Sequence, residues 1–312
     1  MNSIFLFDHN TSVIDEVHFN LWLVGDKKFL DIGLKLNANQ QVELYLPWKT
    51  QNINDLYSKV SSPAILNAIF NEHLSVTANT NNNYVTIVRG GTDLDIVPAN
   101  LIITPLEIHN HEFTKIEISA KYQTPNASYV RLRINWIPNG IFCNTHTGKD
   151  SFINPYREVT EVIDFRVNEM RVLPAAVFAP GGVHAPAITK LHFFLLKSYK
   201  EHILLASPDY LRCRELEDEA WDAYLDNAND KDDVVLAYHW TKSLSLGNHF
   251  AVLATFGMKK TSWLIVFIYA VVLILINISS SYIYGKLTES GQDSHIQLQK
   301  DSLSGVGEKG HK

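Results

Sequence analysis

The stretch Val130-Arg131-Leu132-Arg133-Ile134-Asn135-Trp136 alternates without interruption between apolar side chains at even positions and polar side chains at odd positions. Successive side chains of a β-strand point to opposite faces, so a period of two separates the apolar set from the polar set. The segment therefore predicts a strand with one buried face.

Residues 115–122 alternate in the same way, and the turn-rich residues 123–128 separate them from the first stretch. Two alternating segments joined by a polar turn are typical of an antiparallel hairpin. Further short strands are predicted at residues 17–24, 29–36, 41–46, 84–89, 101–103, 161–172 and 191–197. This spacing favours a β-sandwich over a βαβ fold. We therefore expect a mainly β, antiparallel, sandwich-like fold of one or two modules.

A few helices are expected beside these strands. Residues 54–74 have helical spacing, and Pro63 is placed to start a second helix within them. Residues 208–228 also predict a helix, with Cys213 and Tyr224 on one side. The proline- and glycine-rich residues 174–186 predict a loop or hinge.

We divide the sequence into four regions on this basis. Residues 1–174 are expected to form a β-rich soluble domain, and residues 175–258 a smaller α+β region that continues it. Residues 261–285 are expected to be a transmembrane helix, and residues 286–312 a disordered tail rich in small and polar side chains.

The transmembrane helix is predicted because no charged side chain occurs from Thr261 to Gly285. About 20 apolar residues in a helix suffice to cross the roughly 30 Å hydrocarbon core of a bilayer. Apolar side chains cover every side of this segment, whereas the core helix of a soluble protein has one apolar stripe. A single crossing is therefore expected.

Five side chains are predicted to take part in anchoring the helix. Trp263 lies at one end and Tyr282 and Tyr284 at the other, which is where amphipathic rings settle at headgroup level, and Tyr269 lies within the span. Asn277 belongs to a polar stripe with Tyr284, which either lies in the interface or joins two helices.

The orientation follows from the flanking sequence. Lys259 and Lys260 precede the helix and Lys286 follows it, and positive charge is retained on the cytosolic side. The apolar run at residues 4–7 is too short for a secretory signal. We therefore expect the large N-terminal domain in the cytosol and the short tail on the opposite side of the membrane.

Composition excludes several functional classes. The chain has 312 residues and a formal net charge of −6, so nucleic acid is not an expected partner. Its two cysteines, Cys143 and Cys213, are far apart, which argues against a disulfide framework and against a cysteine-based zinc site. We predict no cofactor.

One candidate metal cluster is His109, His111 and Glu112. An HxH pair on a strand points both imidazoles to one face, where a metal could bridge them with a third ligand such as His146 or His184. The alternative is a solvated loop between strands.

A second candidate site consists of arginines. Arg131 and Arg133 share the polar face of one predicted strand, and Arg166 and Arg171 lie on or near the polar side of another. If the two strands are neighbours, these guanidinium groups form a basic patch for a small anionic ligand. The alternative is a sheet surface of salt bridges.

No nucleophile-elbow, zinc-protease, dinucleotide-binding or kinase motif occurs in the sequence, which favours a non-enzymatic function. We expect a membrane-anchored cytosolic binding module that acts as a sensor, adaptor or effector, with the bilayer, a protein partner or a second copy as partners. One alternative is a metal-dependent hydrolase using His109, His111 and Glu112. Another is a membrane-perturbing effector that oligomerises through its transmembrane helix.

Overall fold

The computed structural model of the chain describes residues 3–8, 13–79, 83–108, 111–147, 156–172, 185–216, 221, 224–225, 234–261 and 263–304. The chain divides into two compact units. One consists of residues 1–146 and 159–258, and the other of residues 147–158 and 259–312.

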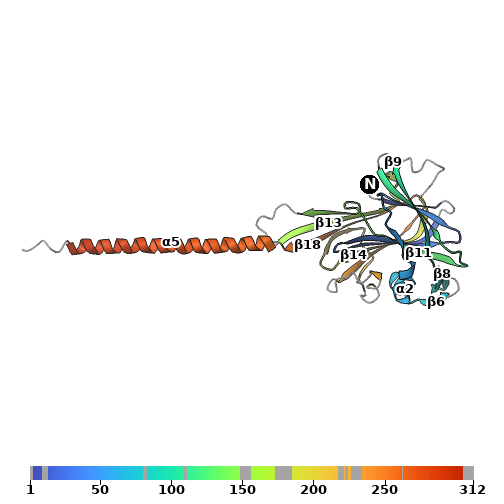
Figure 1. Ribbon diagram of the computed structural model, residues 1–312, viewed down its shortest axis with the longest axis horizontal. Coiled ribbons are helices and arrows are strands. Elements are labelled where there is room, and N and C mark those ends of the chain that lie inside the picture. The colour runs from blue at the N-terminus through green and yellow to red at the C-terminus, as the bar shows by residue number, and fades with distance from the viewer. Residues whose placement is uncertain are drawn as a thin grey trace, which may run out of the picture. The chain divides into compact units, whose positions relative to one another are not determined.

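The first unit is a sandwich of two sheets (Figure 1). Among the described residues, one sheet has the strand order β15-β18-β13-β1-β4-β10-β9, with β12 beside β13. Its strands are β1 (Ser3–Asp8), β4 (Gln41–Leu46), β9 (Ala99–Ile108), β10 (His111–Ala120), β12 (Cys143–Thr147), β13 (Tyr156–Val167), β15 (His202–Ser207) and β18 (Phe250–Thr261).

The second sheet has the order β16-β17-β14-β2-β3-β11-β8-β7-β6, with β5 beside β11. Its strands in the described part of the chain are β2 (Val13–Val24), β3 (Lys27–Leu36), β5 (Ile53–Asp55), β6 (Ser75–Asn79), β7 (Tyr84–Arg89), β8 (Thr92–Ile96), β11 (Ala127–Ile134), β14 (Ala187–Ser198), β16 (Arg212–Glu215) and β17 (Val235–Leu244).

The predicted mainly β, sandwich-like class is confirmed. The sheets are mixed rather than purely antiparallel, because β1 pairs with β13, β14 with β2, and β11 with β8 in parallel. Strands from the region expected to be a smaller α+β part, such as β14 and β18, belong to the same two sheets as the strands before residue 174.

Two local predictions were wrong. The expected hairpin of residues 115–122 and 130–136 does not form, because β10 pairs with β4 and β9 in one sheet while β11 pairs with β3, β5 and β8 in the other. The turn between them carries the chain from one sheet to the other. The helix expected at residues 208–228 does not begin there, because Arg212–Glu215 is β16, an edge strand hydrogen-bonded to β17.

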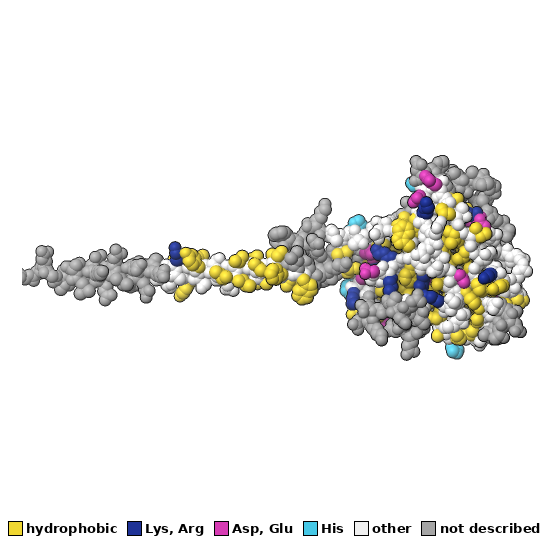
Figure 2. All heavy atoms as spheres, viewed as in Figure 1, with side chains coloured by type: hydrophobic (Ala, Val, Ile, Leu, Met, Phe, Trp, Pro, Cys, Tyr) yellow, Lys and Arg dark blue, Asp and Glu magenta, His cyan; other side chains and the backbone are white. Residues whose placement is uncertain are grey.

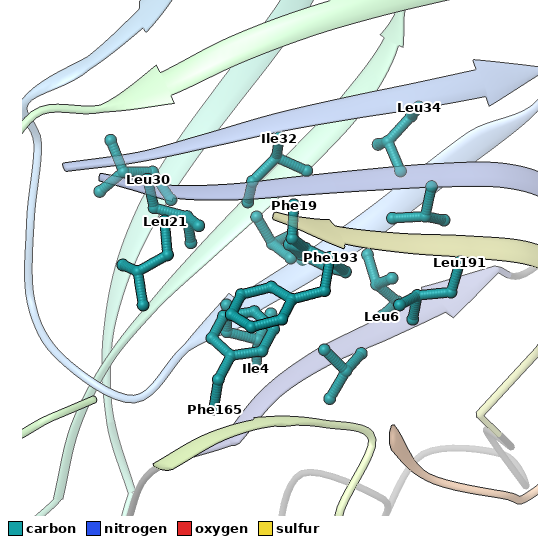
Figure 3. Close-up of a cluster of buried hydrophobic side chains, with 14 of the residues drawn as sticks. Ile4, Leu6, Phe19, Leu21, Leu30, Ile32, Leu34, Phe165, Leu191 and Phe193 are labelled. Carbon is teal, nitrogen blue, oxygen red and sulfur yellow. The ribbon is translucent and has the colours of Figure 1, made fainter. Parts of the chain in front are cut away.

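The main core lies between the sheets (Figure 3). Alternate residues of β2, β3 and β14 point into it, including Phe19, Ile32 and Phe193. Phe193 stacks on Phe165 of the opposite sheet with ring centroids 4.2 Å apart. The packing of large apolar side chains from both sheets provides most of the driving force for this layer.

A second core lies on the other face of the ten-stranded sheet. It is covered by α1 (Tyr57–Val60), α2 (Pro63–Phe70) and the side chains of Trp221, Tyr224 and Leu225. The helix α2 begins at Pro63, as predicted, and the Ser62 side chain caps it by accepting from the backbone N–H of Ile65. Both faces of this sheet are therefore buried in its central strands.

The second unit contains α5 (Trp263–Ser304), within which residues Val266–Thr288 have a mean hydropathy of 2.2. These 23 residues are long and apolar enough to cross a membrane, and none of the span is buried by the protein. Apolar side chains cover this part of the helix in Figure 2. Trp263, Asn277, Tyr282 and Tyr284 are exposed and Tyr269 is partly exposed. The helix continues through part of the expected tail to Ser304.

Candidate functional site

The helix-covered face of the ten-stranded sheet carries an unusual set of polar side chains. Strand register places them in rows: His192 on β14 is opposite His18 on β2, and His18 is opposite Gly33 on β3. Gly33 is in turn opposite Arg131 on β11. Because side chains two residues apart share a face, Asn20, Asp31 and Arg133 form the next row on the same face. We call these rows, with Glu16 and Tyr129, the polar layer.

Glu16 is the centre of one half of the polar layer. Its Oε1 lies 3.0 Å from His18 Nε2 and 3.3 Å from His192 Nε2, while Arg89 Nη1 donates to its Oε2 at 2.6 Å. Glu16 and the two histidines around its Oε1 are all buried. Burial raises the pKa of Glu16, but the His18 and His192 imidazoles and Arg89 together hold it well below its usual range. Glu16 is thus a buried carboxylate anion.

The second ring nitrogen of each histidine also has a partner. His18 Nδ1 lies 3.0 Å from the Tyr129 hydroxyl, which accepts from Arg131 Nη1 at 3.1 Å. His192 Nδ1 lies 2.9 Å from His239 Nε2 on β17. A continuous chain of side chains therefore crosses the sheet from β17 to β11.

Burial keeps two of the histidines in this chain, His18 and His239, uncharged. It lowers the pKa of His18 to about 4, against the opposing effect of Glu16. Burial, and after it the electrostatic effects of the neighbouring His192 and Arg212, lower the pKa of His239 to about 3. Both imidazoles are therefore neutral near pH 7.

The hydrogen-bond partners assign the ring tautomers. Arg212 Nε lies 3.2 Å from His239 Nδ1 and can only donate, so the proton of neutral His239 is on Nε2 and is donated to His192. In the neutral ring the His192 proton is then on Nε2, where it faces Glu16 but makes no aligned hydrogen bond. His18 donates from Nε2 to Glu16 and accepts the Tyr129 hydroxyl proton at Nδ1.

Asp31 is the centre of the other half of the polar layer. Its carboxylate accepts from Arg133 Nε at 2.7 Å and Nη2 at 3.0 Å, from the Tyr224 hydroxyl at 2.6 Å, and from Trp22 Nε1 at 3.1 Å. Arg131 joins the halves, since it also donates to Tyr224 at 2.8 Å. These contacts satisfy a charged group that is fully buried, which would otherwise be strongly destabilising.

Gly33 makes the contact between His18 and Tyr129 possible. A Cβ atom at this position would lie 1.9 Å from the Tyr129 hydroxyl oxygen and 2.6 Å from its Cζ. The Tyr129 ring therefore crosses β3 over the one residue that has no side chain.

A pocket of about 290 Å³ reaches the polar layer from the surface at Glu16. Its other charged lining residues are three cations, Lys35, Arg89 and Lys190, and two anions, Glu72 and Asp93. Arg89 also pairs with Glu72, at 3.3 Å. Glu16 is therefore accessible at this opening, although most of its side chain is buried.

The structure does not bring the four predicted arginines together. Arg131 and Arg133 are buried in the polar layer, whereas Arg166 pairs with Asp164 on β13 and Arg171 pairs with Glu169. The predicted patch required neighbouring strands, but β11 and β13 belong to different sheets. The face that alternation marked as polar on β11 is covered by other protein groups.

The predicted metal cluster is described only in part. His111 and Glu112 are exposed at the start of β10, where Glu112 lies 3.9 Å from Lys49 Nζ. His109 and His184 lie outside the described residues, and His146 is exposed on β12. Within the described ranges, the three residues with the geometry to hold a metal are instead Glu16, His18 and His192.

Sequence reasoning missed this set for an identifiable reason. Glu16 and His18 are two apart on a strand, which is the same signal that drew attention to His109 and His111. His192 joins them only through the parallel register of β14 on β2. No motif in the sequence encodes that register.

No protein-family model fits the chain, and no curated protein matches it in sequence.

Proposed function

We propose that the chain is a single-pass, tail-anchored membrane protein whose β-sandwich is a binding domain that acts beside the bilayer as a sensor, adaptor or effector. The observation that carries this proposal is α5, a helix whose 23-residue apolar span is exposed on all sides. Such a helix is unfavourable in water and stable in a bilayer. The sandwich, by contrast, has extensive buried cores of its own.

In this proposal the sandwich is in the cytosol and residues 286–312 are on the opposite side. Lys259 and Lys260 before the span outnumber Lys286 after it, which favours the cytosol for the side of the sandwich. Binding takes place through a ligand in the pocket at Glu16 or through a protein partner. Lys35 pairs with Asp15, and Arg89 with Glu16 and Glu72, so Lys190 is the cation at that opening that we expect to bind a small anionic ligand.

Anchoring and orientation can be tested together by glycosylation mapping in microsomes. Asn10-Thr11-Ser12 and Asn126-Ala127-Ser128 are natural acceptor sequences on the sandwich side, and Lys300→Asn creates Asn-Asp-Ser in the tail. We expect the chain to resist alkaline extraction and to be modified at residue 300 only. Modification at Asn10 or Asn126 would show that the orientation is the reverse of the one proposed. Release of the chain by alkali would show that it is not anchored in the membrane.

Ligand binding can be tested by titrating the full chain in nanodiscs with inorganic phosphate and with small dicarboxylates. We expect binding that Lys190→Gln weakens, because Lys190 lines the pocket. Lys49→Gln is the control, because Lys49 pairs with Glu112 on a different part of the sandwich. Equal binding by both variants and the parent would place the ligand elsewhere.

A second candidate function is oligomerisation through α5, which would allow the protein to perturb the membrane. One side of the helix, here called the groove side, carries Ser279, Ser280 and Tyr284 among apolar side chains. Small residues allow a second helix to approach closely, and hydroxyl groups can bond across the contact. We expect Ser280→Leu to reduce crosslinking in membranes, with Ile268→Leu as a control outside the groove side. Growth arrest on expression, abolished by deleting residues 263–312, would support the perturbing function.

A further inference from the structure

Glu16, His18 and His192 offer three ligand atoms around one point. Glu16 Oε1 lies 3.0 Å from His18 Nε2 and 3.3 Å from His192 Nε2, and all three atoms lie within 4.8 Å of one another. Ligand atoms of a four-coordinate zinc ion, each about 2.0–2.2 Å from the metal, are separated by similar distances. The side chains need only small movements to enclose an ion.

The remaining atoms of these side chains are held as those of metal ligands usually are. Arg89 occupies Glu16 Oε2, which leaves Oε1 for an ion. Tyr129 holds His18 Nδ1, and His239 holds His192 Nδ1. Such outer contacts fix ring orientation and raise ligand affinity in known metal sites.

His192 gives an independent indication. Its Nε2 is buried and makes no aligned hydrogen bond, although it faces Glu16 Oε1. A buried N–H group whose contact is not aligned as a hydrogen bond is destabilising. Coordination by this nitrogen removes the defect, because the ring proton then moves to Nδ1.

When both histidines bind an ion through Nε2, their ring protons lie on Nδ1, and the hydrogen-bond partners at Nδ1 can adjust to this change. His18 then donates from Nδ1 to the Tyr129 oxygen. His192 donates from Nδ1 to His239 Nε2, whose own proton moves to Nδ1. Arg212, which donates to that Nδ1 in the metal-free form, is exposed and can turn away.

We propose that Glu16, His18 and His192 form a site for a divalent transition metal, with Zn²⁺ as the simplest occupant. Two imidazoles and one carboxylate suit Zn²⁺ or Fe²⁺ rather than the all-oxygen preference of Mg²⁺ and Ca²⁺. The 290 Å³ pocket shares Glu16 with this site and is not lined by His18 or His192, so it reaches the site at the carboxylate alone. This site goes beyond the proposed binding function and is separate from His111 and Glu112.

The test uses the full chain in detergent micelles, stripped with a chelator and loaded with Zn²⁺ or Co²⁺. We expect one ion per chain after gel filtration. We also expect visible absorption typical of four-coordinate Co²⁺, lost on addition of Zn²⁺. A folded chain that binds neither ion, or that gives only the spectrum of hydrated Co²⁺, overturns the proposal.

Variants locate the site. His192→Gln and Glu16→Gln should each weaken Zn²⁺ binding by more than about 100-fold. His239→Phe, which removes only an outer contact, should weaken it by about 10–100-fold. The double variant His111→Gln with Glu112→Gln is the matched control and should bind as the parent does. If the control loses the metal and folded His192→Gln retains it, the site is not the one proposed. If a ligand variant fails to fold, the Co²⁺ spectrum of the parent is the test of whether the chain holds a four-coordinate metal ion.

Discussion

The two faces of the ten-stranded sheet are both buried, yet along the central strands one face is apolar while the other carries the polar layer. Along β2, Val17, Phe19 and Leu21 point between the sheets, whereas His18 and Asn20 point toward α2 and its neighbours. The first face is stabilised by apolar burial and tolerates small shifts. The second is stabilised by specific pairing of charges and hydrogen bonds, where loss of one partner leaves another buried group uncompensated. Strand alternation alone therefore does not show whether the polar face of a strand is solvent-exposed or buried under other parts of the protein.

The largest effect is expected from Asp31→Asn in the polar layer. The change removes a carboxylate that accepts from Arg133, Tyr224 and Trp22, so two buried guanidinium groups lose their nearest anion. Breaking a buried pair in this way costs about 3–5 kcal/mol. Chemical unfolding of the full chain in micelles measures it. A loss below about 1 kcal/mol would mean that the layer behaves as a solvated surface.

A pH dependence of somewhat smaller size is expected for the metal-free protein. The native pKa values of His18 and His239, about 4 and 3, lie below the usual 6.5, so the unfolded chain binds protons first as the pH falls below about 6.5. Stability is thus complete above pH 6.5 and is lost progressively toward pH 4 and below. His18 alone contributes of the order of 3 kcal/mol.

The comparison that isolates this effect is His18→Gln. Free energies of unfolding between pH 7 and pH 4 should depend less steeply on pH in this variant than in the parent. His111→Gln, at an exposed position, should leave the slope unchanged. Identical slopes in the parent and in His18→Gln would show that His18 does not titrate as its burial implies.

Gly33→Ala tests the geometry of the polar layer. The added methyl group would overlap the Tyr129 hydroxyl, so the ring must move and its contact with His18 is lost. Overpacking of this kind costs about 1–3 kcal/mol. Gly257→Ala is the control, because its nearest atom is a terminal methyl of Leu204 at 3.1 Å, which can rotate. In thermal unfolding, the melting temperature of Gly33→Ala should be well below that of Gly257→Ala.

The smallest effect is expected from Asp164→Asn outside the layer. Arg166 pairs with Asp164 at 2.6 Å, but 36% of the Arg166 side chain is exposed, and water compensates for the lost contact. The expected change is below about 1 kcal/mol. An effect as large as that of Asp31→Asn would remove the distinction between the layer and an ordinary surface ion pair.

These contrasts also explain how far the sequence could be interpreted. Alternation at residues 130–134 placed Val130, Leu132 and Ile134 in the core, and the uncharged span before Lys286 predicted a helix able to cross a membrane. Both are local patterns, and both depend only on the period of side-chain burial. The β class and the C-terminal helix were therefore accessible from residues alone.

The polar layer was not accessible because its pairs are distant in sequence. Arg133 bonds to Asp31 across 102 residues, and His18 meets His192 through a parallel pairing of β2 with β14. Strand order and register decide which polar residues meet, and neither is written in any one segment. Arginines on the second face of β11 consequently looked like a surface patch.

The parallel pairings have a consequence for how the protein is made. Ser3 of β1 pairs with Arg166, and β2 lies beside β14. During synthesis these pairings of β1 and β2 cannot form until β13 and β14 have been made. Such long-range closure slows folding and leaves strand edges open to wrong partners during synthesis. Glu16 and His18 meet His192 only once that closure is complete. The polar layer is accordingly assembled late, and an intact layer marks a chain that has finished folding.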